Sequence, residues 1–290
     1  METKLTSATK EVTISSKRPT VLIGERINPT GKKKLTKVLQ NGDLEFVRKE
    51  ALVQVEAGAD ILDINGGALG VDEVVLLPQV VEIVMDTVDV PLCFDSSDST
   101  ALEAALEVYQ GKPLVNSVTG QERSLKKILP LIEEYRAAVI GLTMDEKGIP
   151  EDVDQRVTIA HKIVGKAEAM GIPRQDVIID CLALAVGANT KTGLTAIEAI
   201  RRVKAELGVN LTLGVSNISF GLPDRKLLNS AFITIAIAMG VNCPILDIAK
   251  LRPAILATDL ILDYDRYAMR YIETYRQRQS KSKQAKSDAE

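Results

Sequence analysis

The stretch PLCFDSSDSTALEAALEVYQGKPLVNSV, residues 91–118, contains a complete strand–helix–strand unit. Its two apolar runs are short, as expected of strands that are buried on both faces. Between them, residues 99–109 have the spacing of an amphipathic helix. Asp95 closes the first run and Asn116 lies near the end of the second. The stretch therefore predicts two strands joined by a helix, each with a polar side chain near its end.

The same pattern repeats along the chain, where apolar runs alternate with helical stretches. The runs are TVLIGERI (20–27), ADILDIN (59–65), VPLCFD (90–95), PLVNSV (113–118), AAVIGLT (137–143), DVIIDCL (176–182), LTLGVSN (211–217) and CPILDI (243–248). Eight strands alternating with helices are the number that a (β/α)₈ TIM barrel needs, so an α/β barrel is the predicted fold. A doubly wound open sheet is the alternative, but GERINPTG (24–31) does not fit the G-x-G-x-x-G turn that such a sheet usually carries.

The ends of the chain have a different composition from its body. Residues 1–19 are polar and rich in Ser, Thr and Lys, and residues 277–290 are also polar, so both are predicted to be disordered tails. No Pro/Gly-rich linker divides residues 20–276, which are therefore expected to form one domain. Within it, Thr195 is expected to begin a helix, because Glu198 follows three residues later as in a capping box.

Composition excludes several classes of protein. The chain has 290 residues, 46% of them hydrophobic, and a net charge of −3, which argues against a nucleic-acid partner. The N-terminus has no apolar signal region, and the longest apolar stretch, 231–241, is too short to span a bilayer, so a cytoplasmic protein without a membrane partner is expected. Cys93, Cys181 and Cys243 are widely spaced, which predicts neither disulfides nor a metal site.

Polar residues close almost every apolar run. They are Glu25, Asn28, Asp63, Asn65, Asp95, Asn116, Asp180, Asn217 and Asp247. In a (β/α)₈ barrel the carboxyl ends of the strands meet at one face, where active sites lie. Each residue could instead cap the following helix or satisfy a loop. The set as a whole favours a site, because helix caps would use Ser and Thr as often as Asp and Asn.

Carboxylates and carboxamides with few cations are typical of a site for a neutral heterocycle. A phosphate would require Arg, Lys or a glycine-rich nest. The edge of a pterin carries a 2-amino group beside a ring N–H, and one carboxylate can accept both hydrogen bonds. The rest of that edge mixes donors with acceptors, which an Asn side chain can match.

Seven segments of the chain resemble the pterin-binding methyltransferases. They are IGERINPTG (23–31), ILDINGG (61–67), LCFDSSD (92–98), LVNSVTG (114–120), VIGLTMDEKGIP (139–150), IIDCL (178–182) and LGVSNISFGLPDR (213–225). Taken together, they are most similar to methyltetrahydrofolate:corrinoid/iron-sulfur protein methyltransferases. The folate domain of cobalamin-dependent methionine synthase and dihydropteroate synthase are more distant.

The resemblance implies transfer of the N5-methyl group of methyltetrahydrofolate to or from the cobalt of a corrinoid. It implies that Asp95, Asn116 and Asp180 bind the pterin, and that Asn217, near N5, is catalytic because it helps the nitrogen to leave. We count Glu25 and Asn65, two further strand-end residues, as substrate-binding. No D-x-H-x-x-G signature is present, so the corrinoid is expected on a partner protein.

The resemblance also implies a homodimer, for which the apolar stretch 231–246 offers a surface. Dihydropteroate synthase is the alternative function. It would carry a D-P-G-x-G-F-x-K loop where this chain has IIDCLALAVGANTK (178–191). His161 lies in a predicted helix and is interpreted as structural or solvated. The run Lys32–Lys34 is interpreted as a solvated loop, or else as a docking surface for the glutamate tail of folate or an acidic partner.

Overall fold

The protein is described by a computed structural model that covers residues 1–29, 33–40, 42–67 and 70–287. Eight parallel strands form one sheet in the order β10-β3-β4-β5-β6-β7-β8-β9. Their bounds are β3 Ile23–Ile27, β4 Ile61–Ile64, β5 Leu92–Asp95, β6 Leu114–Thr119, β7 Ala138–Leu142, β8 Val177–Asp180, β9 Asn210–Thr212 and β10 Ile245–Leu246. Each of the eight predicted apolar runs overlaps one of these strands; only β6 and β9 extend past their run, by one residue each.

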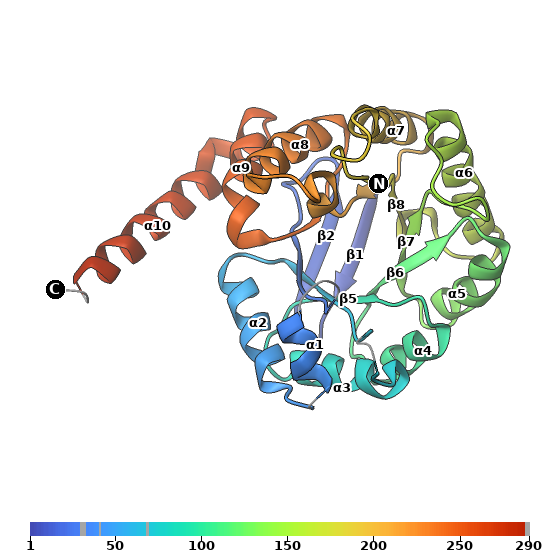
Figure 1. The fold of residues 1–290 in the computed structure, drawn as a ribbon, viewed down its shortest axis with the longest axis horizontal. Helices are drawn as coiled ribbons and strands as arrows, with labels where there is room; N and C mark the ends of the chain where they lie inside the picture. The colour runs from blue at the N-terminus through green and yellow to red at the C-terminus, as the bar shows by residue number, and fades with distance from the viewer. Residues whose placement is uncertain (30–32, 41, 68–69, 288–290) are drawn as a thin grey trace.

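The sheet closes into a barrel. Its two edge strands meet where Gly214 bridges Ile245 in parallel, and the Ile245 N–H donates to the carbonyl of Leu213 at 2.9 Å. Figure 1 looks along the barrel and shows the helices as a ring around the strands. The predicted TIM barrel is confirmed, and the open-sheet alternative is wrong because the edges of the sheet are joined.

Helices follow the strands and cover the outside of the barrel. They are α1 Lys33–Gln40, α2 Glu45–Glu56, α3 Glu73–Met85, α4 Ser99–Val108, α5 Glu122–Glu134, α6 Val153–Ala169, α7 Lys191–Leu207, α8 Arg225–Met239, α9 Ile248–Ile261 and α10 Met269–Ser287. The expected capping box at Thr195 is wrong, because α7 already begins at Lys191. Thr195 lies in its second turn, and its hydroxyl donates to the carbonyl of Lys191 at 3.2 Å.

The strands separate two apolar cores. The core inside the barrel contains Ile23, Ile61, Cys93, Leu114, Ala138, Ile140, Ile178, Cys243 and Ile245. Neighbouring residues such as Leu62, Phe94 and Ile179 face the other way and pack in the core beneath the helices. Because side chains alternate across a strand, a residue two positions after an inner core residue also points into the barrel. This alternation decides where the strand-end polar groups lie.

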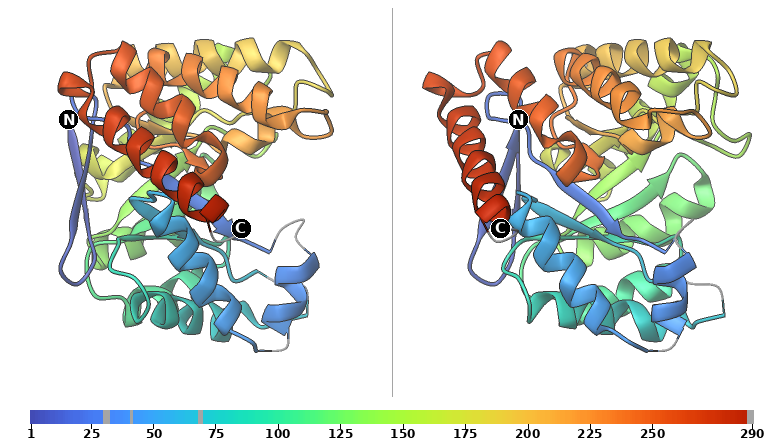
Figure 2. Two further views of the ribbon diagram at one scale, coloured as in Figure 1. Left: turned by 90° about the vertical axis from the view of Figure 1, so that its left-hand side faces the viewer. Right: turned by 60° about the vertical axis from the view of Figure 1, so that its left-hand side comes forward.

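The first nineteen residues are not a disordered tail. β1 (Glu2–Thr6) and β2 (Glu11–Ser15) pair as an antiparallel hairpin across the amino-terminal end of the barrel (Figure 2). Leu5, Val12 and Ile14 are buried in the inner core. The prediction was wrong because the exposed side of the hairpin is polar and dominates the composition, whereas the buried side contributes only a few apolar residues.

The other end of the chain also differs from the prediction. α10 continues through residues 277–287, where a disordered tail was expected, and projects away from the barrel (Figure 1). Its sequence is rich in Gln, Lys and Arg, which are good helix formers. Residues 288–290 lie outside the described part. Among the described helices, none is both long and apolar enough to span a bilayer.

Candidate active site

Six strands carry a polar side chain into the carboxyl end of the barrel. In each case the residue two positions earlier belongs to the inner core, so the alternation turns the polar group toward the barrel axis. The pairs are Ile23 and Glu25, Ile61 and Asp63, Cys93 and Asp95, Leu114 and Asn116, Ile178 and Asp180, and Ile245 and Asp247. The structure therefore places these six of the nine predicted strand-end residues at one end of the barrel.

Asp95 is the centre of a hydrogen-bonded group on the first strands. Its Oδ2 accepts hydrogen bonds from Asn28 Nδ2 and Asn65 Nδ2, both at 3.0 Å. Asn65 Oδ1 accepts from the Gly67 N–H at 2.8 Å, which fixes the orientation of that carboxamide. Burial raises the pKa of Asp95, and the hydrogen bond from Asn65 opposes the shift. Asn65 thus orients Asp95, whose Oδ1 has no hydrogen-bond partner among the described residues.

Asn116 lies beside Asp95 in the sheet register and is supported by Asp63. Its Nδ2 donates to Asp63 Oδ1 at 3.3 Å, so its carbonyl oxygen remains the group that can accept from a ligand. Asp63 is only 2% exposed. Burial and then the neighbouring charge of Asp95 raise the pKa of Asp63 well above its ordinary value. Asp63 was noted as a strand-end acid but not as a site residue. Its position two residues before Asn65 was the available indication.

Asp180 ends β8 and is almost completely buried. Its Oδ1 accepts from the Leu182 N–H at 2.6 Å. Burial raises the pKa of Asp180 to about 7, and Leu182, Arg156 and the backbone of Gly214 act in the opposite direction. An ionised carboxylate accepts about four hydrogen bonds. Asp180 therefore keeps capacity for a two-donor ligand edge.

Asn217 is not at the end of a strand as expected. β9 ends at Thr212, and Asn217 lies in the short 3₁₀ helix η2 (Val215–Ser219) with an exposed side chain. Gly214 lies against this side chain, since a Cβ on Gly214 would be 3.0 Å from Asn217 Nδ2. Asn217 consequently stands at the mouth of the site and not on its wall.

Two side chains hold η2 in place. Ser216 Oγ donates to Glu25 Oε1 at 2.7 Å, which links η2 to β3 across the closed edge of the sheet. Arg225 donates to the carbonyl of Ser216 at 2.7 Å and to Ser219 Oγ at 3.0 Å. Sequence reasoning missed both Ser216 and Arg225, because neither closes an apolar run. Glu25 thus contacts the segment that carries Asn217.

The remaining sequence interpretations can be located. His161 is exposed on α6 and pairs with Glu206 at 3.1 Å, which confirms a role away from the strand ends. Cys93 and Cys181 are buried among apolar residues, and burial raises the pKa of both thiols. Lys32 and the side chains of Lys33 and Lys34 lie outside the described part. Within that part, no cluster of His, Cys, Asp or Glu could hold a metal ion.

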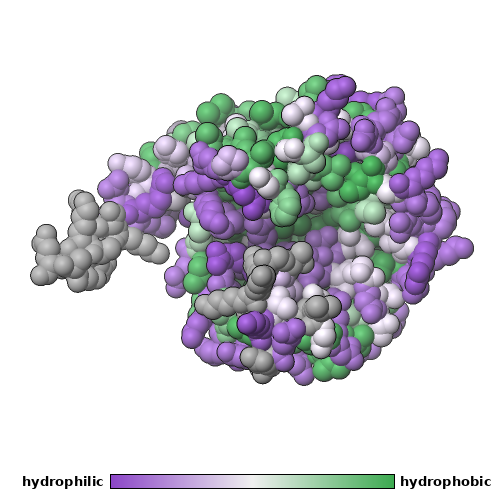
Figure 3. Space-filling view, in the orientation of Figure 1, coloured by the Kyte–Doolittle hydropathy of each residue, from purple (hydrophilic) through white to green (hydrophobic). Residues whose placement is uncertain are grey.

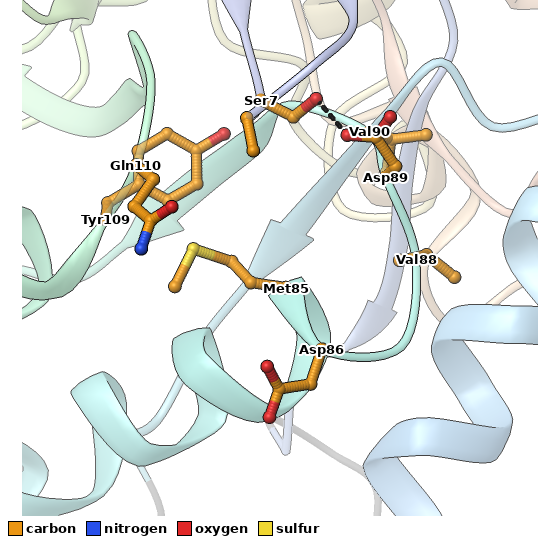
Figure 4. Close-up of a pocket in the computed structure, with 9 residues that line it drawn as sticks. Ser7, Met85, Asp86, Val88, Asp89, Val90, Tyr109 and Gln110 are labelled. Atoms are coloured by element: carbon orange, nitrogen blue, oxygen red, sulfur yellow. Dashed lines mark hydrogen bonds between the residues drawn. The ribbon is translucent and has the colours of Figure 1, made fainter.

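Two cavities lie at the opposite, amino-terminal end of the barrel. One of about 150 Å³ lies beside the hairpin turn, where Asp89 accepts from Ser7 Oγ at 2.5 Å (Figure 4). The other, of about 290 Å³, is bordered by the ion pair of Lys112 with Asp176 at 2.7 Å. Neither contains a predicted site residue. The predicted strand-end residues lie at the other end, so we assign the site to the carboxyl end.

The chain is similar to proteins of known function. A family profile described as pterin binding enzyme matches residues 24–247. The methylcorrinoid:tetrahydrofolate methyltransferase of Eubacterium limosum is 32% identical over 267 residues, which cover 89% of this chain and 96% of that protein. The methionine synthase of Mycobacterium leprae is 29% identical over 87% of this chain, which spans only 22% of that longer enzyme.

Solved structures share the fold at lower identity. Dihydropteroate synthase of Yersinia pestis, bound to a pterine-sulfa conjugate, has a TM-score of 0.69 at 18% identity and covers 90% of this chain and 99% of its own. The enzyme of Xanthomonas albilineans bound to 7,8-dihydropteroate has a TM-score of 0.67 at 23% identity, over 89% and 98% of the two chains. These likenesses establish the barrel. The family match and the relative from Eubacterium limosum show that the chain belongs to the pterin-binding enzymes.

Proposed function

We propose that the protein transfers the N5-methyl group between methyltetrahydrofolate and the cobalt of a corrinoid carried by a partner protein. The observation that carries the proposal is the similarity to the Eubacterium limosum methyltransferase along nearly the whole length of both chains. The barrel supports the proposal because its carboxyl end presents carboxylates and carboxamides from six strands. Residues 20–276 would form the pterin-binding domain, with the hairpin as its closure.

The residues present fit the edge of a pterin. Asp180 is buried and accepts few hydrogen bonds from the protein, so it can accept from the 2-amino group and the adjacent ring N–H. Asp95 offers Oδ1, and Asn116 offers its carbonyl oxygen. Asn65 takes part in substrate binding by orienting Asp95, and Glu25 does so by holding Ser216. We assign pterin binding to Asp95, Asn116 and Asp180 on these grounds.

Asn217 is the residue we assign to chemistry at N5. It lies at the mouth of the site, where a methyl group must be exposed to reach cobalt on another protein. Its carboxamide can donate to N5 or accept from a protonated N5, and either interaction eases departure of the nitrogen. The contact speeds the reaction only if it strengthens toward the transition state. The corrinoid supplies the cobalt that takes or gives the methyl group.

The partner would approach the open carboxyl end of the barrel. Figure 3 shows this face, with apolar surface gathered over α7–α9 and more hydrophilic surface on the opposite side. Leu194, Phe220 and Leu227 are 65–70% exposed near the start of α7 and α8. We propose that the corrinoid protein docks against these side chains. We also propose a cytoplasmic homodimer, for which Ile235 and Ile261, 44% and 80% exposed on α8 and α9, offer apolar surface.

A spectroscopic assay tests the proposal directly. Purified protein is mixed with methyltetrahydrofolate and chemically reduced cobalamin, and the cob(I)alamin absorbance is followed as methylcobalamin forms. The reverse reaction starts from methylcobalamin and tetrahydrofolate. Methyl transfer in either direction supports the proposal. No transfer, together with condensation of a pterin pyrophosphate with 4-aminobenzoic acid, would establish the dihydropteroate synthase alternative instead.

A further inference from the structure

Arg156 is a buried arginine that forms no ion pair with any described residue. It lies in the first turns of α6, is 0% exposed, and makes no salt bridge among the described residues. A cation near the N-terminus of a helix is opposed by the helix dipole, and burial adds to the cost. Burial lowers the pKa of Arg156 accordingly. A residue held at such a cost requires an explanation in terms of what it binds.

Arg156 binds the backbone that follows Asp180. Nη1 donates to the carbonyl of Cys181 at 2.6 Å and to that of Leu182 at 2.8 Å. Nε donates to the carbonyl of Pro150 at 2.8 Å, which anchors the guanidinium on the loop before α6. Nη2 is buried and has no hydrogen-bond partner among the described residues. Two of the three hydrogen bonds of Arg156 therefore go to the turn between β8 and the loop beyond it.

That turn has an unfavourable backbone conformation. Leu182 has a φ of 60°, in the left-handed region that leucine rarely adopts. In this conformation its N–H turns back and donates to Asp180 Oδ1 at 2.6 Å. Arg156 holds the two carbonyls of the turn, and the turn holds one oxygen of the carboxylate. The chain of contacts fixes the direction in which Asp180 faces the barrel mouth.

We infer that Arg156 is a positioning residue that fixes the β8 turn and so orients the Asp180 carboxylate for the pterin. The inference rests on the proposed function, because it takes Asp180 as the acceptor for the pterin edge. Arg156 does not contact the ligand in this account. It acts through Asp180 alone, in two ways: by geometry through the turn, and by its charge, which favours the ionised carboxylate.

A double-mutant cycle separates this role from a merely structural one. Arg156→Lys keeps a cation but loses the planar fork, in which Nε reaches Pro150 while Nη1 reaches Cys181 and Leu182. Arg156→Met removes the charge as well. Each is made in the parent and in Asp180→Asn, and folate affinity is measured by calorimetry from pH 5.5 to 8.5. We expect both substitutions to weaken binding at least tenfold in the parent and less than threefold in Asp180→Asn. Only Arg156→Met should also move the pH midpoint of binding upward.

Lys204→Met is the matched control. Lys204 is also a partly buried helix cation that donates to a backbone carbonyl, that of Val209 at 2.9 Å, but at the amino-terminal end of the barrel. Lys204→Met should lower thermal stability without changing folate affinity or the pH midpoint of folate binding. A folded Arg156→Lys with parental affinity, or an equal loss in the Asp180→Asn background, would overturn the inference.

The same experiment distinguishes failure of the proposed function. If the parent binds folate but does not methylate cobalamin, the proposed reaction is wrong, while the cycle still reports on Arg156. If the parent binds neither folate nor a simple pterin, both conclusions fail. Where Arg156→Met does not fold, the cycle with Arg156→Lys decides, since that variant retains the buried cation.

Discussion

The two ends of the barrel are made from the same strands but satisfy their interior groups differently. At the amino-terminal end, Leu5 and Ile14 of the hairpin fill the interior. The buried side chain of Asn210 is hydrogen-bonded to the hairpin there, because its Nδ2 donates to Thr3 Oγ1 at 2.8 Å and to the Ile14 carbonyl at 3.1 Å. At the carboxyl end, burial raises the pKa of Asp95 and Asp180, and acceptor positions remain. One end is completed by the protein itself, and the other is left for a ligand to complete.

The largest effect on stability is expected at the closed end. Ile14→Ala should lower the free energy of unfolding by about 2–5 kcal/mol, because it removes a fully buried side chain from the inner core. Denaturant unfolding measures this change. Glu11→Ala, on the exposed side of the same strand, should change stability by less than about 0.5 kcal/mol. A loss of folate affinity in folded Ile14→Ala would show that the two ends are not independent.

Asn217 should affect rate more than binding. We expect Asn217→Ala to lower single-turnover methyl transfer to cob(I)alamin on the order of a hundredfold at saturating methyltetrahydrofolate, because a transition-state hydrogen bond is lost. Folate titration should change much less, since Asn217 lies at the mouth and not against the pterin edge. If the variant keeps the parental rate at saturation, Asn217 is a binding residue and the leaving group is activated elsewhere.

Asp180 should show the opposite pattern. Asp180→Asn places a donor where the pterin presents donors, so folate affinity should fall about ten- to a hundredfold. Calorimetric titration measures the change. Asp152→Asn is the control, because Asp152 caps α6 at the same end of the barrel and Asn caps helices equally well. Equal affinities for the parent and Asp180→Asn would show that this carboxylate does not bind the pterin.

The smallest effect expected is on pH dependence. Burial raises the pKa of Asp180 to about 7, and pterin donors require the ionised form, so binding below pH 7 must release a proton. Folate affinity should therefore fall by less than about tenfold between pH 7 and pH 6. The effect of pH on folding stability has the opposite sign to its effect on folate affinity. A carboxyl with a raised pKa stabilises the folded state below the unfolded pKa, and this contribution is lost as pH rises toward 7.

Asp180→Asn supplies the check for both pH effects. In that variant the slope of folate affinity between pH 5 and pH 7 should become shallower, and unfolding free energy should lose part of its pH dependence. An unchanged slope in Asp180→Asn would mean that another group controls the titration, with Asp63 and Asp95 as the nearest candidates because burial also raises their pKa values.

The sequence predicts the open end of the barrel better than the closed end. Most strands lie in an apolar run that is closed by Asp, Asn or Glu, so the group of polar residues at this end follows once the barrel is assumed. The hairpin was not predicted because its buried side contributes only a few apolar residues to a segment that is otherwise polar. Thr195 misleads because a capping motif also occurs inside α7.

Two features of the site depend on information that residue type does not contain. Asn217 closes an apolar run in the sequence, but the strand ends earlier, at Thr212. Asn217 lies in η2, with Gly214 close to its side chain. The α6 segment around Arg156, VDQRVTI, mixes polar and apolar residues, and this pattern does not predict that Arg156 is buried. Each depends on contacts that the local pattern does not contain, such as those of Arg156 with the carbonyls of Cys181 and Leu182.

The pairing of Thr3 with Asn210 has a consequence for synthesis of the chain. These residues are 207 positions apart, so β1 leaves the ribosome long before its buried partner exists. At roughly 5–20 residues per second, the interval is about 10–40 s. During that time the inner core that covers Leu5 and Ile14 is incomplete, because the last strands have not yet been synthesised. Leu5 and Ile14 can therefore reach their final buried environment only after the last strands of the barrel have been synthesised.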